Sequence, residues 1–164
     1  MTAKTQKIKH PFEPICNENS RILILGSFPS VKSREQSFYY GHPQNRFWRM
    51  LSGVFGEQTP VSLEEKKEFL LSHAIALYDV ISSCEIEGSS DSSIKNATPN
   101  DIRSIVEGAQ IEKIITNGKL AHKLYEKHIA ENIALPEVCL PSTSPANAAF
   151  SLERLISEWR AELT

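Results

Sequence analysis

Short runs of branched aliphatic residues recur along the chain and predict buried strands. The first run, residues 21–26 (RILILG), is almost continuously apolar and ends in glycine. Three later runs have the same character, at residues 76–81, 113–116 and 138–140. Continuous rather than alternating apolar residues are typical of strands that are covered on both faces, as in a parallel sheet.

Amphipathic segments separate these runs and predict helices. We expect helices at residues 45–55, 63–71, 119–129 and 150–163, and a further helix that begins in the segment Thr98-Pro99-Asn100-Asp101 with the proline in its first turn. Strands that alternate with helices imply right-handed crossovers. The sequence therefore predicts an α/β fold with a mainly parallel sheet of about four strands, covered by helices on both faces.

Two segments lack such patterns. Residues 1–20 contain Pro11 and Pro14 without periodicity, so we expect an N-terminal arm or irregular lead-in, followed by a single domain at residues 21–164. Residues 82–93 are rich in serine, glutamate and glycine and predict a mobile loop.

Charge and composition narrow the classes of function. The chain has 164 residues with 18 lysines and arginines against 20 acidic residues, a net charge of −2, which is unlike a strongly basic nucleic-acid-binding domain. Any contact with nucleic acid would need a local basic patch. The candidates for it are Lys32, Arg34, Arg46, Arg49 and Lys119.

Cysteines and targeting signals point to a reducing compartment. The three cysteines form no CxxC pair, so neither a disulfide framework nor a metal site is predicted. There is no apolar stretch typical of a signal peptide or a membrane span. We therefore expect a protein of the cytoplasm, or associated with the nucleoid, without a membrane partner.

Small and polar residues follow three of the predicted strands. They form the segments 26–30 (GSFPS), 117–119 (NGK) and 141–147 (PSTSPAN). Ligands of open parallel sheets bind beyond the carboxyl ends of the strands, so these loops are candidates for a binding site. The segment 37–48 (SFYYGHPQNRFW) adds Tyr40, His42 and Asn45 near a helix start, whereas we expect Phe47 and Trp48 in the core.

Four segments together, GSFPS, SFYYGHPQNRFW, TNGKLA and LPSTSPANAAF, resemble the uracil-DNA glycosylase superfamily, in particular its DNA-deoxyinosine glycosylase branch. The resemblance implies a three-layer α/β/α fold and a monomeric enzyme without cofactor or metal. It also implies the substrate, DNA containing deaminated bases, and the reaction, hydrolysis of the N-glycosidic bond of deoxyinosine to release hypoxanthine and leave an abasic site. The alternatives are a mismatch-specific uracil/thymine glycosylase and an inactive module that binds damaged DNA.

The resemblance also implies roles for individual residues. The first motif, GSFPS, lacks the Asp or Asn that many members use to handle water, so this role passes to Asn45, whose amide can orient a water by accepting a hydrogen bond, with Asn117 as second catalytic group. Asp79 is the rival for handling water. The residues expected to bind the substrate are Gly26, Ser27, Phe28, Pro29, Tyr40, His42 and Asp79, with Tyr40 stacking on the base. The residues expected to bind DNA are Ser142, Thr143, Ser144, Pro145, Ala146 and Asn147, with Ser144 also capping the final helix.

Overall fold

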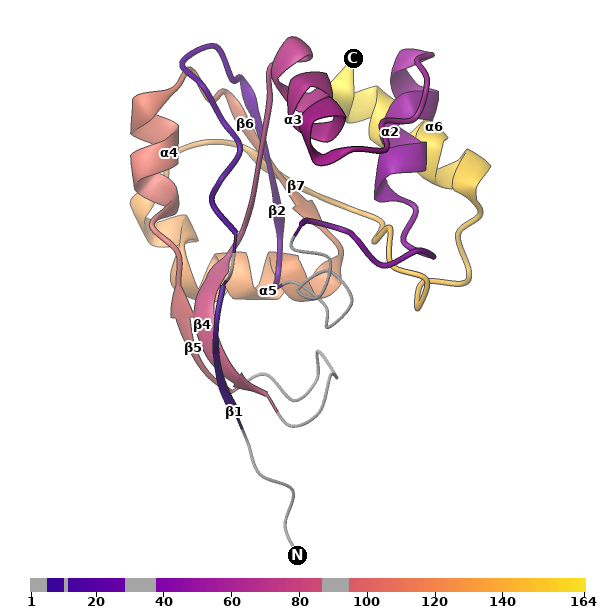
Figure 1. Cartoon of the computed structure of the whole chain (residues 1–164). Helices are drawn as coiled ribbons and strands as arrows, with labels where there is room; N and C mark the ends of the chain where they lie inside the picture. The colour runs from indigo at the N-terminus through magenta and orange to yellow at the C-terminus, as the bar shows by residue number, and fades with distance from the viewer. Residues whose placement is uncertain (1–5, 11, 29–37, 87–94) are drawn as a thin grey trace, which may run out of the picture.

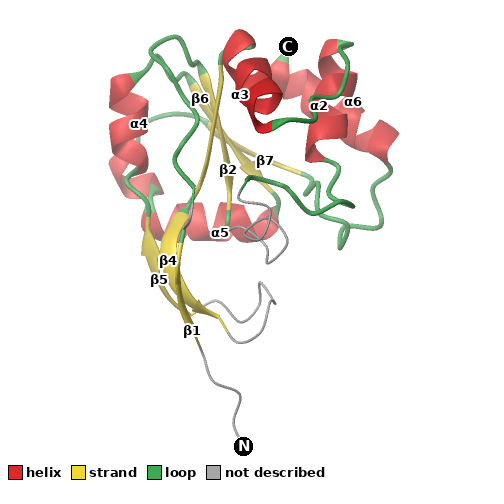
Figure 2. Cartoon of the chain, viewed as in Figure 1, coloured by secondary structure: helices red, strands yellow, loops and turns green. Residues whose placement is uncertain are grey.

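The computed structural model describes residues 6–10, 12–28, 38–86 and 95–164. A parallel sheet lies at the centre of the fold (Figures 1 and 2). Its strands, in spatial order, are β3 (Ile75–Asp79), β2 (Ile22–Gly26), β6 (Lys113–Asn117) and β7 (Glu137–Leu140). The register places Gly26 beside Asp79 and Asn117 beside Leu140, so the carboxyl ends lie at one edge. The predicted four-stranded parallel sheet is confirmed.

Helices cover both faces of this sheet (Figure 1). One layer contains α2 (Phe47–Phe55), α3 (Leu63–Ser72) and α6 (Leu152–Leu163), and the other contains α4 (Ile102–Gly108), α5 (Lys119–His128) and the short 3-10 helix η2 (Ala130–Asn132). In β2, Ile24 packs into the first layer while Leu23 and Leu25 pack into the second. This alternation between two cores is the reason that the strand is continuously apolar.

A second, antiparallel sheet was not predicted. It consists of β1 (Gln6–Lys9), β4 (Ile81–Ile86) and β5 (Lys95–Pro99), with β4 in the middle. The loop expected at residues 82–93 is therefore a strand as far as Ile86, and residues 87–94 lie outside the described part of the chain.

The segment before residue 21 packs closely against the domain. Strand β1 pairs with β4, and Ile15 forms an antiparallel bridge with Leu77 of β3. Phe12 and Ile15 are buried in the first hydrophobic core. The described part of the expected lead-in thus contributes one strand and two core side chains.

Two helix starts differ from the prediction. Pro99 ends β5, and α4 begins at Ile102, where the side chain of Asp101 accepts a hydrogen bond from the Ser104 N–H. Asn100 holds this junction extended because its side-chain amide donates to backbone carbonyls on both sides of Val80. We expected Ser144 to cap the final helix, but its cap is Ser151.

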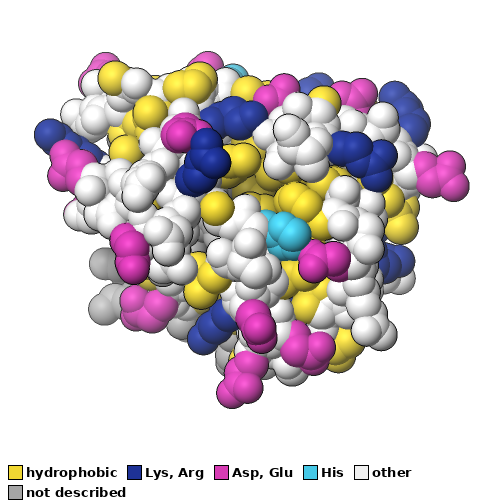
Figure 3. All heavy atoms as spheres, turned by 90° about the horizontal axis from the view of Figure 1, so that it is seen from above, with side chains coloured by type: hydrophobic (Ala, Val, Ile, Leu, Met, Phe, Trp, Pro, Cys, Tyr) yellow, Lys and Arg dark blue, Asp and Glu magenta, His cyan; other side chains and the backbone are white. Residues whose placement is uncertain are grey.

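The face of the molecule seen from above has mixed charge. Figure 3 views the molecule from above, and the acidic and basic side chains drawn there are interspersed, with apolar atoms between them. No described helix is long and apolar enough to cross a membrane.

Candidate active site

A cavity of about 780 Å³ opens at the carboxyl edge of the parallel sheet. Its size lies within the range of small-molecule sites. Most of the described candidate residues line it, namely Gly26, Ser27, Phe28, Tyr40, Asn45, Asp79, Asn117, Ser142, Thr143, Ser144, Ala146 and Asn147. His42 and Pro145 are not among the lining residues, and Pro29 lies outside the described residues.

Asn45 and Asn117 are joined by the fully buried side chain of Thr143. The Thr143 hydroxyl lies 2.9 Å from Asn45 Oδ1 and 3.1 Å from Asn117 Nδ2. The Thr143 N–H also donates to Asn117 Oδ1, at 3.1 Å. Three segments that are distant in sequence are thereby fixed in one hydrogen-bond network.

The network has a defined direction. Asn45 Oδ1 also accepts the Phe47 N–H, at 2.9 Å, so this atom must be the carbonyl oxygen and the Thr143 hydroxyl must donate to it. Both lone pairs of the Asn45 carbonyl are therefore used. Its Nδ2 amino group has no hydrogen-bond partner among the described residues, and Asn45 lines the cavity.

Arg46 connects the segment that contains Asn45 with the loop that follows β7. Its guanidinium donates to the carbonyl oxygens of Ser144 and Asn147, each at 3.0 Å, and to that of Phe150. Its backbone N–H donates to the Thr143 carbonyl at 3.1 Å. These contacts occupy the cation that we expected to contribute to a basic patch, so Arg46 holds the loop that follows β7.

Side chains in this loop are mostly engaged with its own backbone. The Ser144 hydroxyl accepts the Ala146 N–H at 3.2 Å, and Asn147 Nδ2 donates to the Ser142 carbonyl at 3.0 Å. Gly118, at φ +96°, lies against Ser142, and a Cβ on this glycine would be 2.9 Å from the Ser142 Cβ. The loop is thus packed closely onto the start of α5.

Asp79 lines the cavity and is paired with His10. His10 Nε2 lies 2.7 Å from Asp79 Oδ2, and the two side chains are 3% and 5% exposed. The imidazole Nδ1 lies 3.2 Å from the Phe12 N–H and 3.0 Å from the Phe12 carbonyl. The aromatic rings around it belong to Phe12, Phe28, Tyr39 and Tyr78.

Tyr40 forms one wall of the cavity. Its backbone is left-handed, at φ 53°, and its ring stacks on Phe47 with centroids 4.1 Å apart. Its hydroxyl is buried and makes no hydrogen bond to a described residue. Burial and the nearby Asp79 carboxylate raise the pKa of this hydroxyl well above its usual range, and the Asn117 side chain offsets this only in part. The group therefore remains a neutral O–H at physiological pH.

His42 lies apart from these groups. It is half-buried, and its Nδ1 accepts the Gln44 N–H at 3.0 Å. The observed contact is local and shapes the turn before α2.

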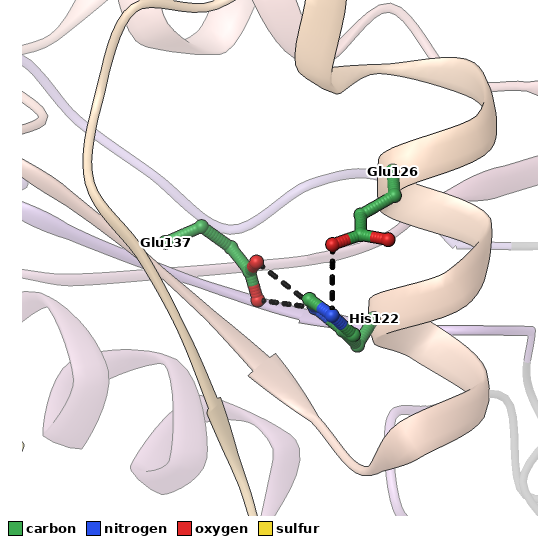
Figure 4. Close-up of side chains that lie close together, drawn as sticks. All are labelled: His122, Glu126 and Glu137. Atoms are coloured by element: carbon green, nitrogen blue, oxygen red, sulfur yellow. Dashed lines mark hydrogen bonds and ion pairs between the residues drawn. The ribbon is translucent and has the colours of Figure 1, made fainter.

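A cluster of His122, Glu126 and Glu137 between α5 and β7 offers potential metal ligands (Figure 4). The two imidazole nitrogens contact different carboxylates, Nε2 with Glu126 at 3.0 Å and Nδ1 with Glu137 at 2.9 Å. One ligand atom from each of the three residues lies within 4.8 Å of the others. The arrangement is that of a histidine held between two acids.

The sequence did not indicate His10 as a residue of the site, nor the structural roles of Arg46 and Thr143. His10 reaches Asp79 because its backbone N–H donates to the Ser82 carbonyl, at 2.6 Å, next to the β1–β4 pairing. No local pattern in the sequence signals this contact. The motif NRFW did mark Arg46, but as a surface cation.

The fold and the site define a class of protein: a three-layer α/β domain with a cavity for a small ligand at the carboxyl edge of its parallel sheet, lined by amide, aromatic and carboxylate groups. The chain belongs to the uracil DNA glycosylase superfamily, which it matches over residues 13–163.

Individual relatives agree with this membership. The chain is 39% identical over 156 residues to the hypoxanthine DNA glycosylase of Methanosarcina acetivorans, covering 94% of this chain and 97% of the relative. It is 35% identical over 153 residues to the protein of the same name from Methanosarcina barkeri, covering 92% and 95%. A solution NMR structure of a protein from Methanosarcina acetivorans matches with a TM-score of 0.82 and 36% identity, covering 96% of this chain and 97% of that chain.

Proposed function

We propose that this protein is a DNA glycosylase that hydrolyses the N-glycosidic bond of deoxyinosine, releasing hypoxanthine and leaving an abasic site. The observation that carries the proposal is the directed network from Asn117 through Thr143 to Asn45 in the wall of the cavity. The two relatives named hypoxanthine DNA glycosylase support the choice of base. DNA containing deaminated bases is the proposed partner, and the protein is proposed to act as a monomer in the cytoplasm or at the nucleoid.

The cavity suits a nucleotide turned out of the duplex. Extruding a nucleotide costs a few kcal/mol, and less when its base is poorly paired, as a deaminated base is. The proposed wall for the face of the base is Phe28, whereas Tyr40, with its ring fixed by Phe47, borders the edge of the base. Gly26 and Ser27 also line the cavity.

Charge develops on the base as the glycosidic bond breaks, and fixed hydrogen-bond donors are the groups that stabilise it. Asn45 offers its Nδ2 amino group for this purpose because both lone pairs of its carbonyl are already used. An amide takes no proton at neutral pH, so the proposed mechanism is dissociative, and water captures the sugar cation after the base has begun to leave. Asn117 holds the network in place and completes the wall.

The rim of the cavity is the proposed DNA surface. Ala146 and Pro145 are exposed at the tip of the loop after β7, and Lys119 is exposed at the start of α5. An exposed ammonium beside a cavity mouth suits a phosphate contact. The Thr143 side chain is buried, so we assign it a positioning role instead of a phosphate contact.

A cleavage assay tests the proposal. Purified protein is incubated with duplexes that carry one deoxyinosine, one uracil or one G·T mismatch, and alkali then cuts each abasic site. We expect cleavage of the deoxyinosine strand at the highest rate. Faster release of uracil or thymine would instead support a mismatch-specific uracil/thymine glycosylase, and tight binding without base release would support an inactive binding module.

A further inference from the structure

We propose that His10 is a positioning residue that fixes the Asp79 carboxylate, so that Asp79 Oδ1 and the Tyr40 hydroxyl form an acceptor–donor pair that reads the lactam edge of a deaminated base. A lactam edge is a ring N–H beside a ring C=O. The inference rests on the proposed function and deepens it, because it names the chemical feature that the cavity selects.

The two oxygen atoms lie together over the end of β2. A Cβ built on Gly26 would lie 2.4 Å from Asp79 Oδ1 and 2.9 Å from the Tyr40 hydroxyl oxygen. Real Cβ atoms do not approach other atoms so closely, so any larger residue here would displace the end of one or both side chains. All three residues line the cavity.

The hydrogen-bond polarity of the pair is set by its surroundings. The Phe12 N–H donates to the imidazole Nδ1, so the ring carries its proton on Nε2, and Nε2 donates to Asp79 Oδ2. Oδ1 has no hydrogen-bond partner in the part of the chain that the structure describes, and as a carboxylate oxygen it only accepts. The Tyr40 hydroxyl, buried and protonated, is free to donate.

This polarity matches one kind of base edge. Hypoxanthine presents N1–H as donor and O6 as acceptor, which pair with Asp79 Oδ1 and the Tyr40 hydroxyl. Adenine, from which hypoxanthine forms by deamination, presents N1 as acceptor and its amino group as donor, the reverse order. A site whose buried groups are left unpaired rejects such an analogue strongly, so the pair distinguishes the damaged base from its parent.

His10 is needed because a carboxylate can rotate about its Cβ–Cγ bond. Its ring is caged by four aromatic rings, with centroid distances from 5.1 Å for Tyr78 to 5.9 Å for Phe28. The cage fixes the ring, and the ring in turn fixes Asp79 Oδ2. His10 lies before residue 13, where the match to the superfamily begins, so this contribution comes from outside the matched segment.

Asp79→Asn tests the polarity. The proton on His10 Nε2 would attract the amide oxygen, which turns the amino group toward the cavity and places a donor where N1–H needs an acceptor. We expect kcat/KM for hypoxanthine release to fall about a hundredfold or more. In the double variant Asp79→Asn/His10→Phe, the amide can turn over, and we expect about a tenfold recovery relative to Asp79→Asn.

Discrimination against 1-methylhypoxanthine, which lacks N1–H, provides a readout that a purely structural role would not move. Wild type should release hypoxanthine much faster than the methylated base, and Asp79→Asn should bring the two rates close together. His10→Gln keeps an N–H donor and should retain discrimination. The matched control is His73→Phe, which removes another histidine–carboxylate contact, with Glu57, while preserving the stacking on Phe55, outside the cavity.

Thermal unfolding identifies any variant that does not fold. If the double variant that contains His10→Phe does not fold, the two single variants Asp79→Asn and His10→Gln still test the inference. Unchanged discrimination in folded Asp79→Asn, or no recovery in a folded double variant, would overturn the inference. A wild-type protein that releases no hypoxanthine would instead overturn the proposed function.

Discussion

The side chains of Asn45 and Asn117 are connected through one hydroxyl group, that of Thr143. Asn117 Nδ2 donates to this oxygen at 3.1 Å, and the oxygen donates to Asn45 Oδ1 at 2.9 Å. Because the Phe47 and Thr143 N–H groups fix which amide atom is the oxygen, neither asparagine can turn over without losing a backbone hydrogen bond. The amides are therefore held in one orientation before any substrate binds.

Thr143→Val should uncouple the two amides while preserving the shape of the residue. We expect kcat for hypoxanthine release to fall about ten- to a hundredfold, because the variant loses one or two hydrogen bonds that each contribute about 1–1.5 kcal/mol. Affinity for the damaged duplex should change little, because the side chain is fully buried. Thr143→Ser restores the hydroxyl and should recover most of the rate in single-turnover kinetics; equal rates for the two variants would contradict this positioning role.

Asn45→Asp distinguishes donation to the base from acceptance from water. Aspartate can still accept from Phe47 and Thr143, but it replaces the free amino group by a second acceptor. We expect the chemical step to slow about a hundredfold or more, as when an oxyanion-hole donor is removed. A rate equal to or above wild type would show that Asn45 handles water instead. Asn132→Ala, an exposed asparagine outside the cavity, is the control.

Arg46→Met should destabilise the protein rather than alter its charge contacts with DNA. It removes the guanidinium from the carbonyls of Ser144, Asn147 and Phe150 while keeping a long apolar side chain. We expect the free energy of unfolding in urea to fall by about 2–4 kcal/mol. The salt dependence of DNA affinity should stay as in wild type, and a shallower slope would show that Arg46 contacts phosphate.

Lys119→Gln should change the salt dependence of DNA affinity and leave stability almost unchanged. Its ammonium is exposed at the rim, so stability should change by less than about 0.5 kcal/mol. The slope of log affinity against log salt should become shallower by about one phosphate contact, close to 0.9. With a net charge of −2, the wild-type slope itself should be small, and about three contacts would give a loss of about fortyfold between 50 and 200 mM salt. A slope unchanged by Lys119→Gln would place the DNA surface elsewhere.

The central sheet could be predicted because its signal is local. Each residue of the segment Leu23–Leu25 is buried against one of two cores, so the apolar run itself reports a covered strand. The loops at the strand ends followed from the general geometry of parallel sheets. That reasoning placed Asn117 at the candidate site, the resemblance to the superfamily added roles for Asn45 and Asp79, and all three residues line one cavity.

What could not be predicted depends on contacts between distant segments. Ser144 followed by Pro145 has the local character of a helix start, yet the guanidinium of Arg46 binds the carbonyls of this segment and α6 begins only after Ser151. His10 acquires its position through the pairing of β1 with β4, which no pattern near His10 indicates. The use of both Asn45 lone pairs was likewise invisible, since it requires Thr143 to be in place.

The pairing of β1 with β4 also couples the state of the cavity to the order of the chain's first described strand. A base that engages Asp79 would restrict the motion of this carboxylate and of the His10 ring bound to it, and the His10 N–H is itself bound to the Ser82 carbonyl of β4. Occupation of the cavity should therefore slow amide hydrogen exchange in β1. The small antiparallel sheet then serves as an internal reporter of base capture, which hydrogen-exchange mass spectrometry can follow without a chemical label.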